Sequence, residues 1–261
     1  MGQGVIILNS EKVTLQSNVI HEFVKFGITG DSSEDFKIEQ NVINGVRIKA
    51  EEGWPWPYDL WLGEFAGLQL RSSTNYEVKD NIVASVWHAG YMLPPYECGG
   101  TAVHTGNVAH SISGYGLIVQ PPVGGELDCA EFSDFKGYKT RKATMHMGGG
   151  IKSKTNMMNN IVAIDSFTGL MPFGGKDDGH VEVSDSSFYG SKDMPNKDCP
   201  DDDACDQCMD KSALWLPVFG DHKYETFDAP NKLNKMYKDS GKWGGSSLFK
   251  DVTFIGYHDT T

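Results

Sequence analysis

Acidic residues and histidines are the side chains of this chain that could carry out catalysis. Asp165 occupies a position that Phe23 and Ile112 hold in related stretches, so a carboxyl stands where apolar residues are otherwise found. With Asp185 nearby in register, two carboxyl groups could flank a glycosidic bond about 5 to 10 Å apart, as hydrolysis requires. A shift of one residue would instead point Asp165 to solvent. Asp165, Asp185 and His110 are therefore the catalytic candidates of an enzymatic interpretation.

Histidines recur at one position of the same related stretches. His21 and His110 each follow an asparagine by three residues. If the stretches stack as successive layers of a sheet, these two histidines share a face. They then lie several layers apart, roughly 15 Å or more at a strand spacing of about 4.8 Å. The two side chains cannot bind one metal ion.

The elements that must position these residues are copies of an internal repeat. In four copies an asparagine is followed by two small or branched apolar residues and, nine positions after the asparagine, by a glycine. The asparagines are Asn18, Asn81, Asn107 and Asn160, the glycines are Gly27, Gly90, Gly116 and Gly169, and Asn41 begins a fifth copy without the glycine. The intervals correspond to a unit of roughly 20 to 27 residues, which is the length of one solenoid rung.

Apolar runs within each unit have the length and composition of short strands. Residues 13–15 and 68–70 are examples, and such runs end at Gly, Asn, Asp or Ser. We predict an all-β fold, a right-handed single-stranded parallel β-helix (solenoid) with long loop insertions. Asn and Gly at its bends would take left-handed backbone conformations. Stacked amides would bond to one another in a ladder of Asn18, Asn41, Asn81, Asn107 and Asn160.

The repeat extends through most of the chain, so we predict a single parallel β-helix domain over residues 1–261. Residues 191–243 interrupt this domain as a cysteine-containing insertion, and Pro-containing stretches at 51–61 and 93–100 predict further loops. A solenoid accepts insertions because a loop leaves and rejoins between adjacent rungs. Residues 1–9 lack the positive segment of a signal peptide, and we expect the chain to be a fragment of a larger protein.

Two of the predicted loops carry side chains suited to binding. The aromatic residues of the first loop could form a platform for sugar rings or pack back over the rungs. They are Trp54, Trp56, Tyr58 and Trp61. Clustered carboxylates in the insertion suit calcium, or form a solvated acidic loop. They are Asp201, Asp202, Asp203 and Asp206. We predict no cofactor other than this calcium.

Composition argues against two classes of function. The chain has 35 acidic and 23 basic residues among 261, a net charge of −12, and no basic stripe is visible in the sequence. Binding to a phosphate backbone requires such a stripe, so we do not expect nucleic acid as a partner. No run of 18 apolar residues exists, and no membrane span is predicted.

Five cysteines suggest an oxidising compartment. They are Cys98, Cys129, Cys199, Cys205 and Cys208. The last three crowd into the polar insertion, which would need a crosslink to hold a fold. Zinc is the alternative, although that loop has no second Cys or His pair at ligand spacing. We prefer disulfide bonds, whose connectivity the sequence leaves open.

Four stretches together resemble one family. Residues 80–91, 105–111, 199–219 and 243–254 are similar to the parallel β-helix region of fibrocystin and fibrocystin-like proteins, the polycystic kidney and hepatic disease family. The resemblance spans roughly residues 5–256. It implies a large secreted or single-pass ectodomain, often at cilia or other cell-surface projections, with structural or receptor-like roles. Related β-helix proteins that depolymerise hyaluronan share the architecture, but none of their catalytic motifs matches a position here.

We therefore expect an extracellular structural or interaction scaffold within a large cell-surface or ciliary-surface protein. It would bind other extracellular proteins or glycans through its loops, and could assemble with further segments of its own parent chain. The alternative is a polysaccharide-degrading β-helix enzyme of the glycoside hydrolase or lyase type.

Overall fold

The computed structural model describes eleven ranges of the chain. They are residues 4–23, 25–46, 66–71, 73–100, 103–119, 127–147, 154–166, 168–171, 179–190, 212–214 and 245–256. Their regular secondary structure is entirely β, with strands arranged in four sheets. No helix among these ranges is long and apolar enough to cross a membrane.

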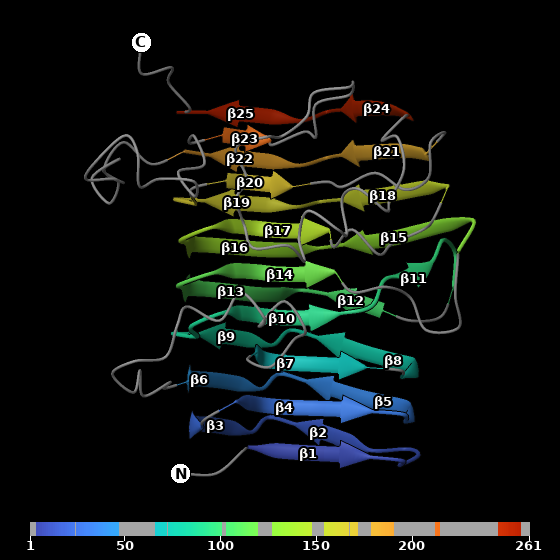
Figure 1. Ribbon diagram of the computed structural model, residues 1–261, viewed down its shortest axis with the longest axis vertical. Helices are drawn as coiled ribbons and strands as arrows, with labels where there is room; N and C mark the ends of the chain where they lie inside the picture. Colours follow the sequence, from blue (N-terminus) through green and yellow to red (C-terminus); the bar gives the residue numbers. More distant parts are fainter. Residues whose placement is uncertain are drawn as a thin grey trace, which may run out of the picture.

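Two eight-stranded sheets run along the molecule from end to end (Figure 1). Sheet A consists of β1 (Val5–Leu8), β4 (Phe26–Asp31), β7 (Ala66–Arg71), β10 (Ala89–Leu93), β14 (Tyr115–Val119), β17 (Ala143–Met147), β20 (Thr168–Met171) and β23 (Ser212–Leu214). Sheet C consists of β3 (Val19–Phe23), β6 (Val42–Val46), β9 (Ile82–Ala84), β13 (Asn107–Ile112), β16 (Phe135–Thr140), β19 (Val162–Ile164), β22 (Ser187–Tyr189) and β25 (Thr253–Ile255).

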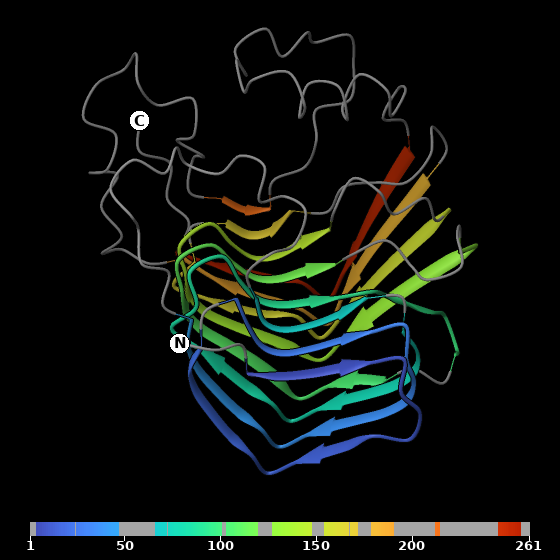
Figure 2. The same cartoon turned by 60° about the horizontal axis from the view of Figure 1, so that its bottom comes forward.

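The third wall of the solenoid is divided between two shorter sheets. Sheet B consists of β2 (Thr14–Gln16), β5 (Glu34–Glu39), β8 (Thr74–Lys79) and β12 (Val103–Thr105). Sheet D consists of β11 (Tyr96–Glu97), β15 (Cys129–Ser133), β18 (Thr155–Asn159), β21 (Gly179–Ser184) and β24 (Gly245–Lys250). No ladder joins β12 to β15, so the wall is interrupted between them. Figure 2 shows the strands of sheet D running at a different angle from those of sheet B.

The chain passes through sheet A, then sheet B or D, then sheet C, and returns to sheet A one rung higher (Figures 1 and 2). Neighbouring strands pair in parallel, as Ile28 of β4 pairs with Leu68 of β7. The exception is β11, which pairs with β15 in the antiparallel sense. The path turns in the right-handed sense as it rises, and the predicted right-handed parallel β-helix is confirmed.

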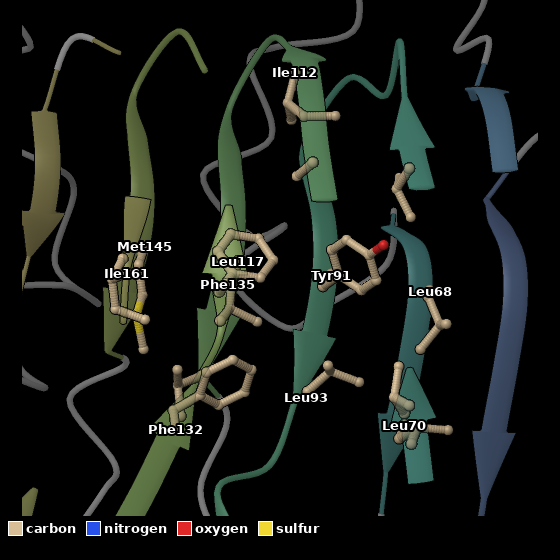
Figure 3. Packing of buried hydrophobic residues seen from close by; sticks show 14 of the residues in the cluster. Leu68, Leu70, Tyr91, Leu93, Ile112, Leu117, Phe132, Phe135, Met145 and Ile161 are labelled. Carbon is tan, nitrogen blue, oxygen red and sulfur yellow. The ribbon is translucent and has the colours of Figure 1, made fainter. Parts of the chain in front are cut away.

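Inward-facing side chains of the three walls form one continuous core (Figure 3). One column of sheet A places Leu68, Tyr91, Leu117 and Met145 one above another, each without solvent exposure. Burial of such columns supplies the main stabilisation, because apolar surface leaves water on folding. The hydroxyl of Tyr91 donates to the carbonyl of Asn81 at 2.7 Å, so its polar atom is satisfied within the core.

Asparagine side chains stack at the corner between sheets B and C. The amide Nδ2 of Asn18 donates to Oδ1 of Asn41 at 2.9 Å, Asn41 to Asn81 at 2.9 Å, and Asn81 to Asn107 at 3.1 Å. Each Oδ1 also accepts from the backbone N–H of the preceding asparagine, at 3.0 to 3.2 Å. Asn41, Asn81 and Asn107 are buried, and the ladder satisfies their polar atoms along the solenoid axis.

Asn160 does not belong to this ladder. The register between β16 and β19 places Ile161 beside Phe135 and, through Phe135, in the column of Asn107. Asn160 precedes that column by one residue, and its Nδ2 donates to Oδ1 of Asp134 at 2.6 Å. Apolar side chains fill the ladder position in these rungs, so no amide is needed there.

The left-handed bends lie beside the asparagine column. The residue before each ladder position has a positive φ, including Gln40 (56°), Asp80 (53°) and Asp134 (54°), whereas the ladder asparagines do not. Short polar side chains tolerate this conformation because they bond locally to the backbone. Of the five asparagines predicted to be left-handed, Asn160, which lies outside the ladder, has a positive φ of 54°, and for the four ladder asparagines the prediction was wrong by one residue.

The repeat glycines serve close packing. Gly27, Gly67, Gly90 and Gly116 stack in sheet A, and none has a positive φ. A Cβ added at Gly67 would lie 2.8 Å from the carbonyl oxygen of Gly90 and closer still to the side chain of Val83 in sheet C. These glycines let sheets A and C approach where they converge, which corrects the prediction that they occupy left-handed bends.

Candidate functional site

The predicted catalytic residues lie apart at the two edges of sheet C. Asp165 has φ = 52° and occupies the corner between sheets C and A, whereas Asp185 has φ = 48° and occupies the corner between sheets D and C. Asp185 stacks on Asn160, which precedes Asp165 by five residues, so the two carboxyls are about 15 Å apart at strand rise. That separation exceeds the span over which two carboxyl groups act on one glycosidic bond.

Asp165 does not replace a core residue. Ser166 is the residue in the column of Ile112 and Thr140, and it is buried, while Asp165 lies one position earlier at the partly exposed bend. The hydroxyl of Ser166 contacts those of Thr140 and Thr144, each at 2.7 Å, and the three form a satisfied polar cluster. The sequence alignment was therefore shifted by one residue, and the acid faces outward.

Several predicted binding residues lie outside the described ranges. These are the aromatic loop residues Trp54, Trp56, Tyr58 and Trp61, the aspartates Asp201, Asp202, Asp203 and Asp206, and the cysteines Cys199, Cys205 and Cys208. Within the described ranges, no group of three or more His, Cys, Asp or Glu side chains could hold a metal ion.

The loop at residues 93–100 is fastened to sheet D. Cys98 forms a disulfide bond with Cys129, the first residue of β15. The hydroxyl of Tyr96 contacts that of Ser133 at 3.0 Å, and the backbone N–H of Cys98 donates to the carbonyl of Cys129 at 3.2 Å. This loop packs on the solenoid wall at the interruption between sheets B and D.

The outer face of sheet C carries two columns of side chains, which we call the sheet C face. The first column consists of Val19, Val42, Ile82, Val108, Lys136 and Val162 in successive rungs. The second consists of His21, Asn44, Ala84, His110, Tyr138, Ile164 and Tyr189. Six apolar or aromatic residues of these columns are exposed by 36% to 71%, namely Val19, Val42, Ile82, Tyr138, Ile164 and Tyr189, whereas Val108 and Val162 are partly buried and Ala84 is buried. Contiguous exposed apolar surface of this kind marks interaction sites.

Aromatic and cationic groups gather in the middle of the sheet C face. The ring centroids of His110 and Tyr138, on adjacent rungs, are 5.9 Å apart. Lys139 Nζ lies 5.1 Å from the centroid of the Tyr138 ring, a cation–π geometry. His110 and His21 share one column with two rungs between them, as predicted from their repeat position.

A second group of rings lies at sheet A, where Tyr115 of β14 and His146 of β17 are almost fully buried. Tyr115 stacks on His146 with centroids 5.0 Å apart and meets His88 edge-on at 6.0 Å. Lys142 Nζ lies 5.5 Å from the centroid of the Tyr115 ring. Burial lowers the pKa of His146 to about 3 and that of His88 to about 4, and the charge of Lys142 adds to both shifts. Both imidazoles are therefore neutral at pH 7, and their low pKa makes them weak bases.

His104 is a core residue. Its side chain continues the inward column of Ile38 and Val78 in sheet B. The imidazole stacks on Phe132 with ring centroids 4.6 Å apart, and its Nε2 lies 2.9 Å from the carbonyl oxygen of Pro94. Burial lowers its pKa to about 4, against the hydrogen bond to Pro94. The ring fills the core as a neutral imidazole.

The sequence analysis did not identify the ring contacts of the group on the sheet C face or of the group at sheet A. Tyr115, Tyr138 and His146 occupy ordinary strand positions, and their rings meet only across rungs. A detectable signal was present in residues 136–142, a KGYKTRK run with four cationic side chains in an acidic chain.

Comparison with known proteins returns no relative of this chain. No family model matches it, and neither the curated proteins nor the solved structures contain a significant match.

Proposed function

We propose that this chain is a rigid extracellular scaffold that binds protein or glycan partners, as one module of a large cell-surface or ciliary-surface protein. The resemblance to fibrocystin-like β-helix regions supports the cell-surface placement, and the disulfide bond between Cys98 and Cys129 fits an oxidising compartment. The sheet C face is the observation that carries the binding role.

Two properties of the sheet C face support binding. Its first column begins with three exposed branched side chains, Val19, Val42 and Ile82, whose neighbours in the strands point into the core. A flat face built on continuous parallel ladders changes shape little, so a partner orders few groups when it binds. Binding through the predicted loops at 51–61 and 191–243 remains a further part of this proposal.

A substitution experiment tests this role. The triple variant Val19→Thr, Val42→Thr and Ile82→Thr keeps β-branched side chains in the strands and removes apolar surface. We expect binding to extracellular-matrix proteins and glycans on an array to fall for this variant, with an unchanged melting temperature. Equal binding by the variant and the wild type would contradict a role for this column.

The second candidate is a polysaccharide-degrading enzyme of the lyase type. The contacts of the Tyr115 phenol with His88 and His146 are the observation behind it, because an imidazole and a phenol in contact can transfer a proton next to a carbonyl. Turnover of uronic-acid polysaccharides, followed by absorbance of the unsaturated product and abolished by His146→Gln, would support this candidate over the scaffold. Absence of turnover across a glycan panel would contradict it.

A further inference from the structure

Residues of β16 form a cationic and aromatic cluster on the sheet C face. Lys136 and Tyr138 are two positions apart in the strand, so their side chains leave the same side of the sheet. Lys139 follows at the bend with φ = 51° and reaches over the Tyr138 ring. His110 borders this ring from the preceding rung. We call these four residues the Tyr138 cluster.

The two lysines of the cluster are available for an anionic ligand. Both are exposed, and neither forms an ion pair with a described residue, unlike Lys37 and Lys79, which pair with Glu77. The nearest preceding acid is Asp134, whose Oδ1 accepts from Asn160 and whose Oδ2 accepts from Thr105 at 2.9 Å. Asp165 lies in register with Lys139 on the next rung, and its one carboxylate only partly offsets the charges of the two lysines.

The local charge opposes that of the whole chain. Lys136 and Lys139 of the cluster are both cationic, whereas the chain carries a net charge of −12; the other two cations of residues 136–142, Arg141 and Lys142, lie beyond the end of β16, and Lys142 lies over the Tyr115 ring. A local excess of positive charge on an acidic chain favours contact with an anion, so the cluster helps to select the site of contact. The ligand class is therefore anionic.

The ring of Tyr138 specifies the ligand further. Tyr138 as a residue is 38% exposed, and Lys139 lies over one face of its ring. Sugar rings stack their C–H groups on such phenol faces while their charged substituents meet flanking cations. Along the same column lie Ile164 and Tyr189, which are apolar or aromatic and also exposed. A ligand that lies along the solenoid axis thus needs a negative charge at the rung of Tyr138 and apolar groups at the following two rungs. A chain with widely spaced charges meets this requirement.

We propose that the Tyr138 cluster binds a carboxylated, unsulfated polysaccharide, with a sugar ring on Tyr138 and a uronate carboxylate between Lys136 and Lys139. Densely sulfated chains fit less well, because sulfates would fall against Val162 and Ile164 in the following rung. Nucleic acid fits less well for the same reason, since it carries a phosphate at each nucleotide. This inference rests on the proposed binding role of the sheet C face and names its partner.

Direct binding measurements with the full chain test the proposal. The probes are hyaluronan oligosaccharides, heparin fragments of matched length and neutral dextran, titrated by calorimetry at two salt concentrations. We expect the Lys136→Gln/Lys139→Gln variant and the Tyr138→Ala variant each to weaken hyaluronan binding by about tenfold or more, and Tyr138→Phe to retain it. Lys12→Gln/Lys250→Gln is the matched control, with the same change in charge at exposed positions elsewhere.

Different contrary results would overturn the ligand class, the site or the whole inference. Tighter binding of heparin than of hyaluronan, or equal binding of dextran, would overturn the assignment to a carboxylated glycan. Hyaluronan binding that is unaffected by all cluster variants would overturn the site, and no binding of any probe would overturn the inference as a whole. The proposed scaffold role fails separately, through the variant of Val19, Val42 and Ile82 and its other partners.

Discussion

The side-chain amide of Asn41 donates a 2.9 Å hydrogen bond to Oδ1 of Asn81, which lies 40 residues later in the sequence. Asn81 also accepts from the backbone N–H of Asn41 and donates to the carbonyl of Ile38 and to Asn107. We predict that Asn81→Leu lowers the free energy of unfolding by about 3 kcal/mol or more, because several buried polar groups lose their partners. Urea denaturation followed by circular dichroism measures this loss.

Asn18→Leu is the control for the asparagine ladder. Asn18 is exposed at the N-terminal end of the ladder, and Oδ1 of Asn41 keeps the backbone N–H of residue 18 as a donor after the change. We expect a loss below about 1 kcal/mol. Similar losses for the two variants would contradict the special cost of interrupting the ladder.

Gly67→Ala tests the close approach of sheets A and C. The added Cβ would overlap the side chain of Val83 and lie 2.8 Å from the carbonyl oxygen of Gly90, so the two sheets must move apart. We expect a loss of about 2 kcal/mol or more in the free energy of unfolding, measured by urea denaturation. Gly45→Asn is the control, because its φ of 82° is tolerated by asparagine and its Cβ has room. A tolerated Gly67→Ala would show that these sheets can separate freely.

His104 makes stability depend on pH. Its pKa is about 4 in the folded chain against 6.5 ordinarily, so the unfolded chain binds more protons between these values. Stability is therefore full above about pH 6.5 and falls as the pH drops toward 4, by about 3 kcal/mol for this residue. We predict that His104→Phe, which keeps the stacking on Phe132, reduces the decline between pH 6.5 and 5. Thermal melts across this range measure it, and an unchanged slope would contradict the prediction.

Reduction of the disulfide bond between Cys98 and Cys129 should destabilise the third wall. The bond joins residues 31 positions apart, which corresponds to about 3 to 4 kcal/mol in the chain-entropy description. We expect the double variant Cys98→Ser/Cys129→Ser to unfold at a lower urea concentration than the wild type. The wild type in reductant should match that variant, and equal midpoints with and without reductant would refute a stabilising bond.

The fold could be predicted from those residues whose identity is required by their neighbours in the stack. Asn41, Asn81 and Asn107 could be recognised because only an amide both donates and accepts along a stack. Asn160 was misplaced because Ile161 fills the same column with an apolar side chain, and the change from amide to apolar packing leaves no mark in the local sequence. The glycines were located correctly, but their role depends on the distance between two sheets.

The candidate sites were harder to predict from the sequence than the fold. Asp165 was assigned to the core by an alignment shifted one residue, and in strands a shift of this size exchanges the inner and outer faces. The contacts of His110 with Tyr138 and of Tyr115 with His146 join adjacent rungs, and the residues of each pair lie 28 and 31 positions apart in the sequence. Such contacts require the register between rungs, which the sequence pattern did not specify.

The interruption between β12 and β15 has a mechanical consequence. A pulling force along the solenoid axis passes through the continuous ladders of sheets A and C, but in the third wall no ladder spans this break. Cys98 and Cys129 bridge β11 and β15 at this place, so a covalent bond takes tension there. In the oxidised molecule this bond shares the load with sheets A and C, whereas in the reduced molecule the short antiparallel pairing of β11 with β15 is left to connect the third wall at this point.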